Sequence, residues 1–313
     1  MTKSTTAKST TLPFMQQHFI DLSNKQRLCV EMAGDEKRPT ILLIMGLGSQ
    51  LTMWPDAFCQ LLLDSGFRVI RFDNRDSGLS NKCEFLQPPL SLLKTMGRFS
   101  LGLATNGASY TLYDMAEDVH LLLNTLHIEK AHILGASMGG MIAQILAAKY
   151  PNQVKSLGLL FTSNNQSFAQ PPNLSILKQM FKRPKSNNPE DIINNTVQFY
   201  QMIASPNYST NSQFYDFAQG LYQRSYHPMG TQRQFYAILT TGSLKKINHM
   251  IQSPTLIIHG SKDKLIPPSN GKAVAKAIPH AKFELIDGLG HDISPHFMAK
   301  LADLFTDHFM ANN

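Results

Sequence analysis

The sequence has 313 residues, 42% of them hydrophobic, and a formal net charge of +7 from 29 Lys and Arg against 22 Asp and Glu. This length and apolar content predict one large α/β domain or two smaller ones with a sizeable core. No apolar run is long enough to cross a membrane and no nucleic-acid-binding module accompanies the basic residues, which argues against stable membrane insertion and nucleic-acid partners.

Residues 1–12 are basic and rich in Ser and Thr. They lack the apolar stretch of a secretory signal peptide, and they predict a flexible tail rather than an organellar transit peptide. The three cysteines, Cys29, Cys59 and Cys83, have neither the number nor the spacing of a disulfide framework or a zinc site. We therefore expect a cytoplasmic protein without a metal ion.

Strand and helix patterns alternate through the first half of the chain. Two short segments, 16–22 and 26–34, predict an antiparallel pair. Continuous apolar runs then predict strands buried on both faces, and amphipathic segments between them predict helices. The predicted strands are 38–46, 67–73, 131–136 and 154–161, and the predicted helices are 54–66, 111–126 and 137–151. This order predicts a doubly wound, mostly parallel sheet with right-handed crossovers.

The alternation stops after Phe161 and resumes near residue 250, with strands at 253–260 and 281–287 and helices at 269–278 and 295–309. The segment between them contains short helical patterns, eight Lys or Arg against three acids, and six of the nine tyrosines. An insertion between two strands of one sheet leaves from the carboxyl edge, where open α/β sheets bind ligands. We therefore predict a core of residues 13–162 and 250–313 and a helical lid of residues 163–249.

One serine stands between glycines at the predicted turn from a strand into a helix, in Gly135-Ala136-Ser137-Met138-Gly139. Such a turn brings the positions two before and two after the serine too close together for side chains, which explains Gly135 and Gly139. It lifts the Ser137 hydroxyl above the sheet and leaves the Met138 N–H at the helix N-terminus, aimed at an oxyanion. The segment predicts a nucleophilic serine.

A serine nucleophile needs a base, and the base needs an orienting acid. Asp263 and His291 each follow a late predicted strand, in loops that leave the carboxyl edge. Taken singly, Asp263 has the sequence of an ordinary turn aspartate and His291 that of a surface imidazole. The order Ser137, Asp263, His291, with each residue at the end of a strand, matches the hydrolase arrangement and predicts a catalytic triad. The second oxyanion donor is predicted at the Leu47 N–H, because Gly46 frees the backbone to turn inward.

Five segments together resemble the α/β-hydrolase superfamily, and within it the esterase branch that contains the aclacinomycin methylesterases. They are "LLIMGLGSQLTMWPDAF", "RFDNRDSGLS", "GASMGGMIAQ", "HGSKDKLIPP" and "GLGHDISP". The resemblance extends from about Pro13 to the C-terminus. It implies an α/β-hydrolase fold with a helical lid, a triad at Ser137, Asp263 and His291, and no cofactor. The chain departs from the superfamily pattern at Met45, where many members have His before the glycine, so the bracing of the oxyanion loop stays open.

Other polar residues have structural interpretations. We predict that "FDNRDSG", residues 72–78, is a self-bonded turn rather than part of the pocket. Asp292 is predicted to be a solvated loop carboxylate, and His259 a satisfied core histidine. Asp114 and Asp118 are predicted to lie on the polar face of a helix.

The resulting expectation is a serine hydrolase that cleaves a carboxylic ester of a small hydrophobic substrate through an acyl-enzyme. Other triad reactions stay open, namely hydrolysis of amides, lactones, thioesters or carbon–carbon bonds and perhydrolysis, as does a ligand-binding protein with little turnover. The aromatic and Met side chains of residues 163–249 predict either an apolar pocket or simply the core of the lid itself. Whether the positive charge of the lid serves an anionic ligand is open, and the sequence does not indicate an oligomeric state.

Overall fold

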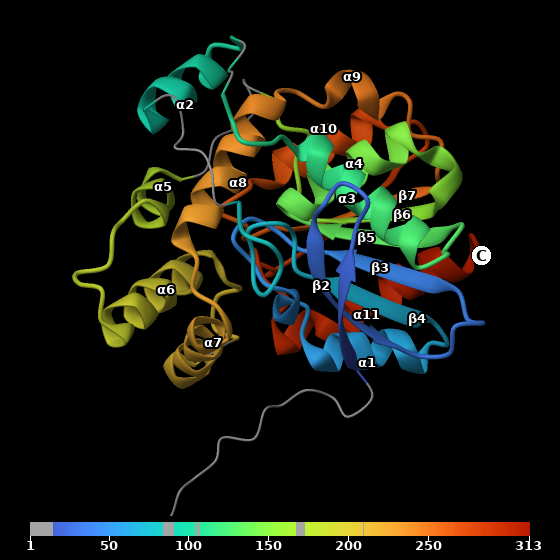
Figure 1. Cartoon of the computed structure of the whole chain (residues 1–313), viewed down its shortest axis with the longest axis horizontal. Coiled ribbons are helices and arrows are strands. Elements are labelled where there is room, and N and C mark those ends of the chain that lie inside the picture. Colours follow the sequence, from blue (N-terminus) through green and yellow to red (C-terminus); the bar gives the residue numbers. More distant parts are fainter. Residues whose placement is uncertain (1–14, 84–90, 104, 106, 167–172, 209) are drawn as a thin grey trace, which may run out of the picture.

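One sheet of eight strands organises the part of the chain that the structure, a computed structural model, describes (Figure 1). The described residues are 15–83, 91–103, 105, 107–166, 173–208 and 210–313, so the predicted tail of residues 1–12 lies outside them, as do residues 167–172 and 209 of the predicted lid. The strands follow the order β1-β2-β4-β3-β5-β6-β7-β8. Their bounds are β1 Gln16–Asp21, β2 Arg27–Ala33, β3 Thr40–Ile44, β4 Arg68–Phe72, β5 Ala131–Ala136, β6 Val154–Leu160, β7 Thr255–Gly260 and β8 Lys282–Ile286.

The predicted doubly wound sheet and its antiparallel entry pair are confirmed. β1 pairs antiparallel with β2, and β2 pairs antiparallel with β4. All the other neighbours, from β4 across to β8, pair in parallel. Because parallel strands point the same way, the loops that follow β3, β5, β7 and β8 meet at one carboxyl edge.

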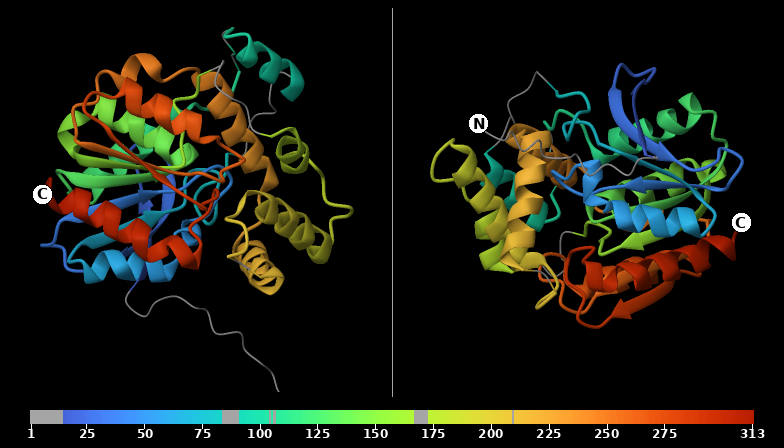
Figure 2. Two further views of the ribbon diagram at one scale, coloured as in Figure 1. Left: turned by 180° about the vertical axis from the view of Figure 1, so that it is seen from behind. Right: turned by 90° about the horizontal axis from the view of Figure 1, so that it is seen from below.

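Helices cover both faces of the sheet, and each face has its own apolar cluster (Figures 1 and 2). One cluster packs α3 (Leu112–Thr125), α4 (Met138–Lys149) and α10 (Pro268–Ala277) against the sheet. The other packs α1 (Asp56–Asp64) and α11 (Pro295–Met310) against the opposite face. With both faces covered, every residue of β3, β4, β5 and β7 is buried, which accounts for the continuous apolar runs of these strands.

The described part of the insertion between β6 and β7 forms five helices: α5 Leu174–Met180, α6 Pro189–Ile203, α7 Asn211–Arg224, α8 Pro228–Thr241 and α9 Lys245–Asn248. Helices α5, α6 and α7 stand beside the core rather than on a face of the sheet, together with α2 (Leu92–Ser100) from the core sequence (Figures 1 and 2). α8 contacts both α2 and α3 and so joins α2 to the core.

Two buried ion pairs attach the insertion to the loop after β4. Arg224, the last residue of α7, lies 2.8 Å from a carboxylate oxygen of Asp73, and Arg233 of α8 donates two hydrogen bonds of 2.8 Å to Asp76. Burial by itself would raise the pKa of Asp76, but hydrogen bonds from Arg233 and from Tyr110 outweigh burial and lower it. The segment 72–78 is therefore a structural turn, but the prediction that it is self-bonded and outside any pocket is wrong. Much of its bonding reaches into the insertion, and residues 76–78 border a cavity.

The prediction that Asp118 lies on a polar helix face is wrong. Its carboxylate is buried and accepts two hydrogen bonds of 2.6 Å from Arg75, with a third of 2.8 Å from Asn24. Arg75 belongs to the loop after β4, and this loop folds against α3 where the sequence pattern predicts solvent. Asp114 accepts the Thr111 N–H and thereby caps the start of α3.

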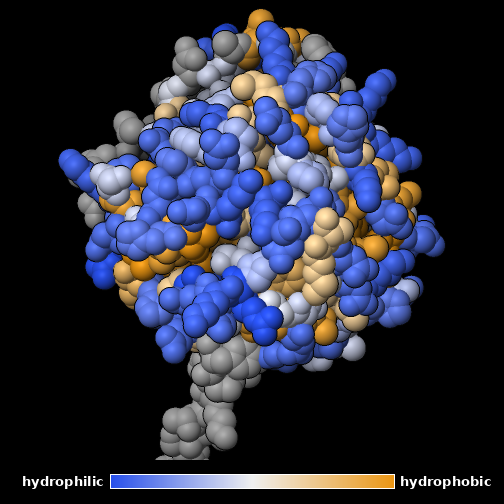
Figure 3. Space-filling model, turned by 90° about the vertical axis from the view of Figure 1, so that its right-hand side faces the viewer, coloured by the Kyte–Doolittle hydropathy of each residue, from blue (hydrophilic) through white to orange (hydrophobic). Residues whose placement is uncertain are grey.

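The face of the core turned away from α5–α7 is mainly hydrophilic, with scattered apolar residues (Figure 3). Among the described residues, the helices are all too short or too polar to cross a membrane.

Candidate active site

Ser137 occupies the turn between β5 and α4 in a strained backbone conformation, with φ 54° and ψ −121°. A Cβ on Gly135 would lie 2.4 Å from the carbonyl oxygen of Gly139, as the predicted close approach requires. The reason for Gly139 differs from the prediction, because its own Cβ would lie 2.1 Å from the carbonyl oxygen of Ile44, at the end of β3. Both positions exclude a side chain, and the turn packs against β3 as well as against itself.

The loop after β3 lies directly against the serine. A Cβ on Gly46 would be 3.0 Å from the Cβ of Ser137, so glycine lets the loop come this close without a tight contact. Among the described residues, the Leu47 N–H has no hydrogen-bond acceptor. The Met138 N–H stands at the first position of α4, where a helix leaves its N–H groups unpaired. Two backbone donors are thus present beside Ser137.

The bracing of this loop, which the sequence leaves open at Met45, comes from two amide side chains. Asn74 donates a hydrogen bond of 2.9 Å to the Met45 carbonyl, and the Gly48 N–H donates one of 2.7 Å to the side-chain oxygen of Gln234. Gln234 is fully buried on α8 and also donates to the Arg75 carbonyl at 2.7 Å. The sequence analysis missed Gln234, because 186 residues separate it from Gly48 and no local motif marks it.

Asp263 and His291 are in contact, as predicted. The Nδ1 atom of His291 lies 2.7 Å from Oδ2 of Asp263, and Oδ1 of Asp263 accepts the N–H groups of Leu265 and Ile266. Burial opposes the charged form of Asp263, but the interactions with His291 and His259 outweigh it and lower the pKa of the carboxyl to about 2. Asp263 is therefore a charged acceptor that orients the His291 ring.

His259 is not the satisfied core histidine that the sequence predicts. Its Nε2 atom lies 2.7 Å from the Ile266 carbonyl oxygen and 3.2 Å from Oδ2 of Asp263, so Nε2 bears the proton. Its Nδ1 is buried without a hydrogen-bond partner in the described structure and faces Gly271, where a Cβ would lie only 2.4 Å away. His259 is thus a second histidine at the Asp263 carboxylate.

The end of α6 holds the loop that contains His291. The Ile203 carbonyl accepts the His291 N–H at 2.8 Å, and the Ser205 hydroxyl accepts the Gly290 N–H at 2.8 Å. Asp292 is not a solvated carboxylate, because it accepts hydrogen bonds from the backbone and the side chain of Ser205. Burial raises the pKa of Asp292. The insertion therefore takes part in positioning His291.

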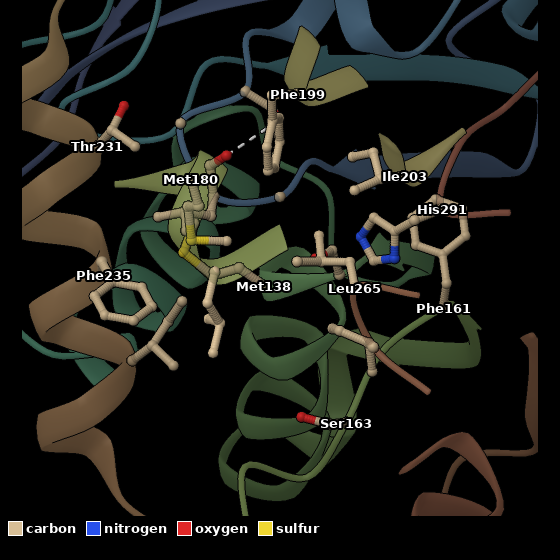
Figure 4. Close-up of a pocket in the computed structure, with 18 of the residues that line it drawn as sticks. Met138, Phe161, Ser163, Met180, Phe199, Ile203, Thr231, Phe235, Leu265 and His291 are labelled. Atoms are coloured by element: carbon tan, nitrogen blue, oxygen red, sulfur yellow. Dashed lines mark hydrogen bonds between the residues drawn. The ribbon is translucent and has the colours of Figure 1, made fainter. Parts of the chain in front are cut away.

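Ser137 and His291 line one cavity of about 510 Å³ beneath the insertion (Figure 4). In the close-up, Met180 and Phe235 from the insertion stand on one side and His291 from the core on the other, with Met138 and Leu265 between them. Six methionines and five aromatic residues contribute to the lining: Met45, Met53, Met96, Met138, Met141, Met180, Phe99, Phe161, Phe199, Tyr200 and Phe235. Neither Lys nor Arg is among the described residues that line it, and the one acid there is Asp292. The cavity is suited to an apolar group.

The described residues contain no cluster of His, Cys, Asp or Glu arranged to hold a metal ion. The groups that the site does combine are a hydroxyl on a strained turn, an imidazole oriented by a carboxylate, and two unpaired N–H groups.

Known proteins are similar to this chain in sequence or in fold. The chain is 23% identical to a rhodomycin D methylesterase from Streptomyces peucetius over 83% of its length and 87% of that protein. It is 28% identical to the human monoacylglycerol lipase ABHD6 over 62% of its length and 59% of that protein. The fold matches a 2-hydroxy-6-oxo-6-phenylhexa-2,4-dienoate hydrolase from Rhodococcus with a TM-score of 0.73 at 18% identity, covering 95% of this chain and 99% of that one.

The match to a protein-family model shows to which family the chain belongs. The model described as "alpha/beta hydrolase fold" matches residues 39–295, which include both predicted oxyanion donors and all three predicted triad residues. The chain therefore belongs to the α/β-hydrolase fold family of hydrolases.

Proposed function

We propose that this protein is a serine hydrolase that cleaves a carboxylic ester with a hydrophobic part. In this mechanism Ser137 attacks the ester carbonyl while His291 takes its proton and passes it to the leaving alcohol. Asp263 holds the imidazole, and the N–H groups of Leu47 and Met138 bind the oxyanion. Water then deacylates Ser137, and residues 163–249 act as the lid over the cavity.

The contact between Asp263 and His291 at 2.7 Å, with His291 lining the same cavity as Ser137, is the observation that carries the proposal. A positive φ at a residue other than glycine is strained, and strain of this kind clusters at functional sites. The apolar lining of the cavity supports a hydrophobic ester, and the methylesterase and lipase among the relatives support ester chemistry. An enol-lactonase from Burkholderia xenovorans has the same fold with a TM-score of 0.72, so lactones belong among the test substrates.

Burst kinetics test the proposal. Wild type, Ser137→Ala and the control Ser65→Ala, whose serine lies outside the described cavities, are mixed with p-nitrophenyl esters of increasing acyl length. We expect a burst of one nitrophenol per active site in wild type and in Ser65→Ala, and none in Ser137→Ala. Equal activity of Ser137→Ala and wild type would refute the nucleophile, and folded but inert wild type towards esters and lactones would favour a ligand-binding role.

A further inference from the structure

A second cavity of about 590 Å³ adjoins the first. It lies among the loop after α5 and helices α6, α7 and α8, and its lining includes Lys182, Arg183 and Tyr222. Eight residues border both cavities: Leu47, Gly48, Met180, Asn195, Thr196, Tyr200, Thr231 and Phe235. The loop with the proposed oxyanion donor therefore forms part of the wall between them. In Figure 4, Met180, Thr231 and Phe235 of this wall stand on the side of the first cavity away from His291.

The two cavities differ in charge. The first has no Lys or Arg among its described lining residues, whereas Lys182 and Arg183 border the second. Neither Lys182 nor Arg183 has an acidic partner among the described residues. The Lys182 ammonium lies 3.2 Å from the neutral amide oxygen of Gln198. The one acid that borders the second cavity, Asp76, is already neutralised by two hydrogen bonds from Arg233. An excess of positive charge therefore remains at the second cavity.

The eight basic residues of the insertion thus have different surroundings, and two of them, Lys178 and Lys185, lie outside the lining of both cavities. Arg224 and Arg233 are bound to the buried carboxylates of the loop after β4. Lys245 and Lys246 lie on α9, outside the lining of both cavities. Lys182 and Arg183 combine exposure, the lack of an acidic partner and a position at the rim of a cavity.

We propose that the two cavities form one bipartite site and that the substrate is an amphiphilic ester with a carboxylate remote from the scissile bond. The hydrophobic part lies in the first cavity, the chain passes the shared wall, and the carboxylate lies beside Lys182 and Arg183. Met180 suits a position in such a wall, because an unbranched thioether side chain adapts its shape readily. This inference rests on the proposed function, since it places the scissile carbonyl at Ser137.

The test compares two series of p-nitrophenyl esters of equal length, one ending in a free carboxylate and the other in its neutral methyl ester. The variant Lys182→Gln/Arg183→Gln is compared with the matched control Lys245→Gln/Lys246→Gln, which removes the same charge from the same insertion. We expect the first variant to lower kcat/KM for the longer carboxylate esters by about three- to tenfold through KM, and 0.5 M salt to remove most of this difference. The control variant should match wild type, and neutral esters should not distinguish the enzymes.

For each double variant, kcat/KM for the carboxylate ester is divided by kcat/KM for the neutral ester. Equal ratios in the two variants would overturn the inference while leaving the serine mechanism intact. If wild type cleaves none of these esters, the proposed function fails instead. Calorimetric binding of the same compounds to Ser137→Ala, with and without Lys182→Gln/Arg183→Gln, then decides the inference. A dissociation constant for the carboxylate series that rises with the charge removal supports the site, and one that does not change overturns it.

Discussion

Replacement of Gln234 by Leu tests whether the insertion holds the oxyanion loop in place. The change leaves the Gly48 N–H and the Arg75 carbonyl without their buried partner at 2.7 Å. Of the two groups, the Arg75 carbonyl belongs to a buried residue, whereas Gly48 is exposed and its N–H can bond to water. An unpaired buried group costs about 1–3 kcal/mol, so we expect the free energy of unfolding to fall by about 1–3 kcal/mol. Because the Leu47 N–H is the neighbour of the released group, we also expect kcat to fall by up to about 100-fold with KM nearly unchanged.

Gln144 provides the matched control. It is also a fully buried glutamine, and it donates to the carbonyls of Gly140 and Ser163 and accepts from Asn248. Because these partners are all buried, Gln144→Leu should lose at least as much stability as Gln234→Leu, without a comparable loss of kcat. The assays are thermal unfolding and ester kinetics at a temperature where both variants are folded. Equal losses of kcat in the two variants, or wild-type kcat in Gln234→Leu, would refute the bracing role.

Three further changes have expected outcomes. The depressed pKa of Asp263 contributes about 2 kcal/mol of stability that is fully present above pH 3.8 and is lost as the pH falls towards 2. His259→Phe removes one of the interactions that lower this pKa, so urea unfolding between pH 2 and 5 should show the loss completed at higher pH than in wild type. Gly135→Ala should yield little folded protein on circular dichroism, because the new Cβ would lie 2.4 Å from a backbone oxygen. Gly220→Ala on α7, where a Cβ meets open space, should instead stabilise the protein by up to about 1 kcal/mol, and an unchanged or lower melting temperature would contradict this.

The parts of the fold that follow from periodicity and strand direction could be predicted from the sequence. Buried parallel strands are recognisable as apolar runs, and their carboxyl ends share one edge, which is why Asp263 and His291 could be expected to meet. The glycines near Ser137 are needed because the turn leaves no room for a side chain at their positions. This requirement is local, so a short segment of sequence is enough to recognise the turn.

The contacts that could not be predicted join segments far apart in the chain. Asp118 occupies a polar position in the pattern of α3, and nothing nearby in the sequence indicates that Arg75 covers it. Ser205 and Asp292 are 87 residues apart, and each alone has the sequence of a surface residue. Such pairs depend on how the insertion docks, which periodicity within one helix does not determine.

The hydrogen bonds that Ser205 and Gln234 accept from Gly290 and Gly48 limit how this enzyme can be re-engineered. Exchange of residues 163–249 for the corresponding segment of another family member would remove the contacts that hold the Gly48 and Gly290 backbone in place. A chimera designed to change substrate preference should therefore retain the end of α6, the buried face of α8 and Arg224 at the end of α7, which pairs with Asp73. It should draw its new residues from α5, the rest of α7 and the loop after α5. Only within that smaller portion of the insertion can the substrate specificity of this hydrolase be changed without disturbing its catalytic geometry.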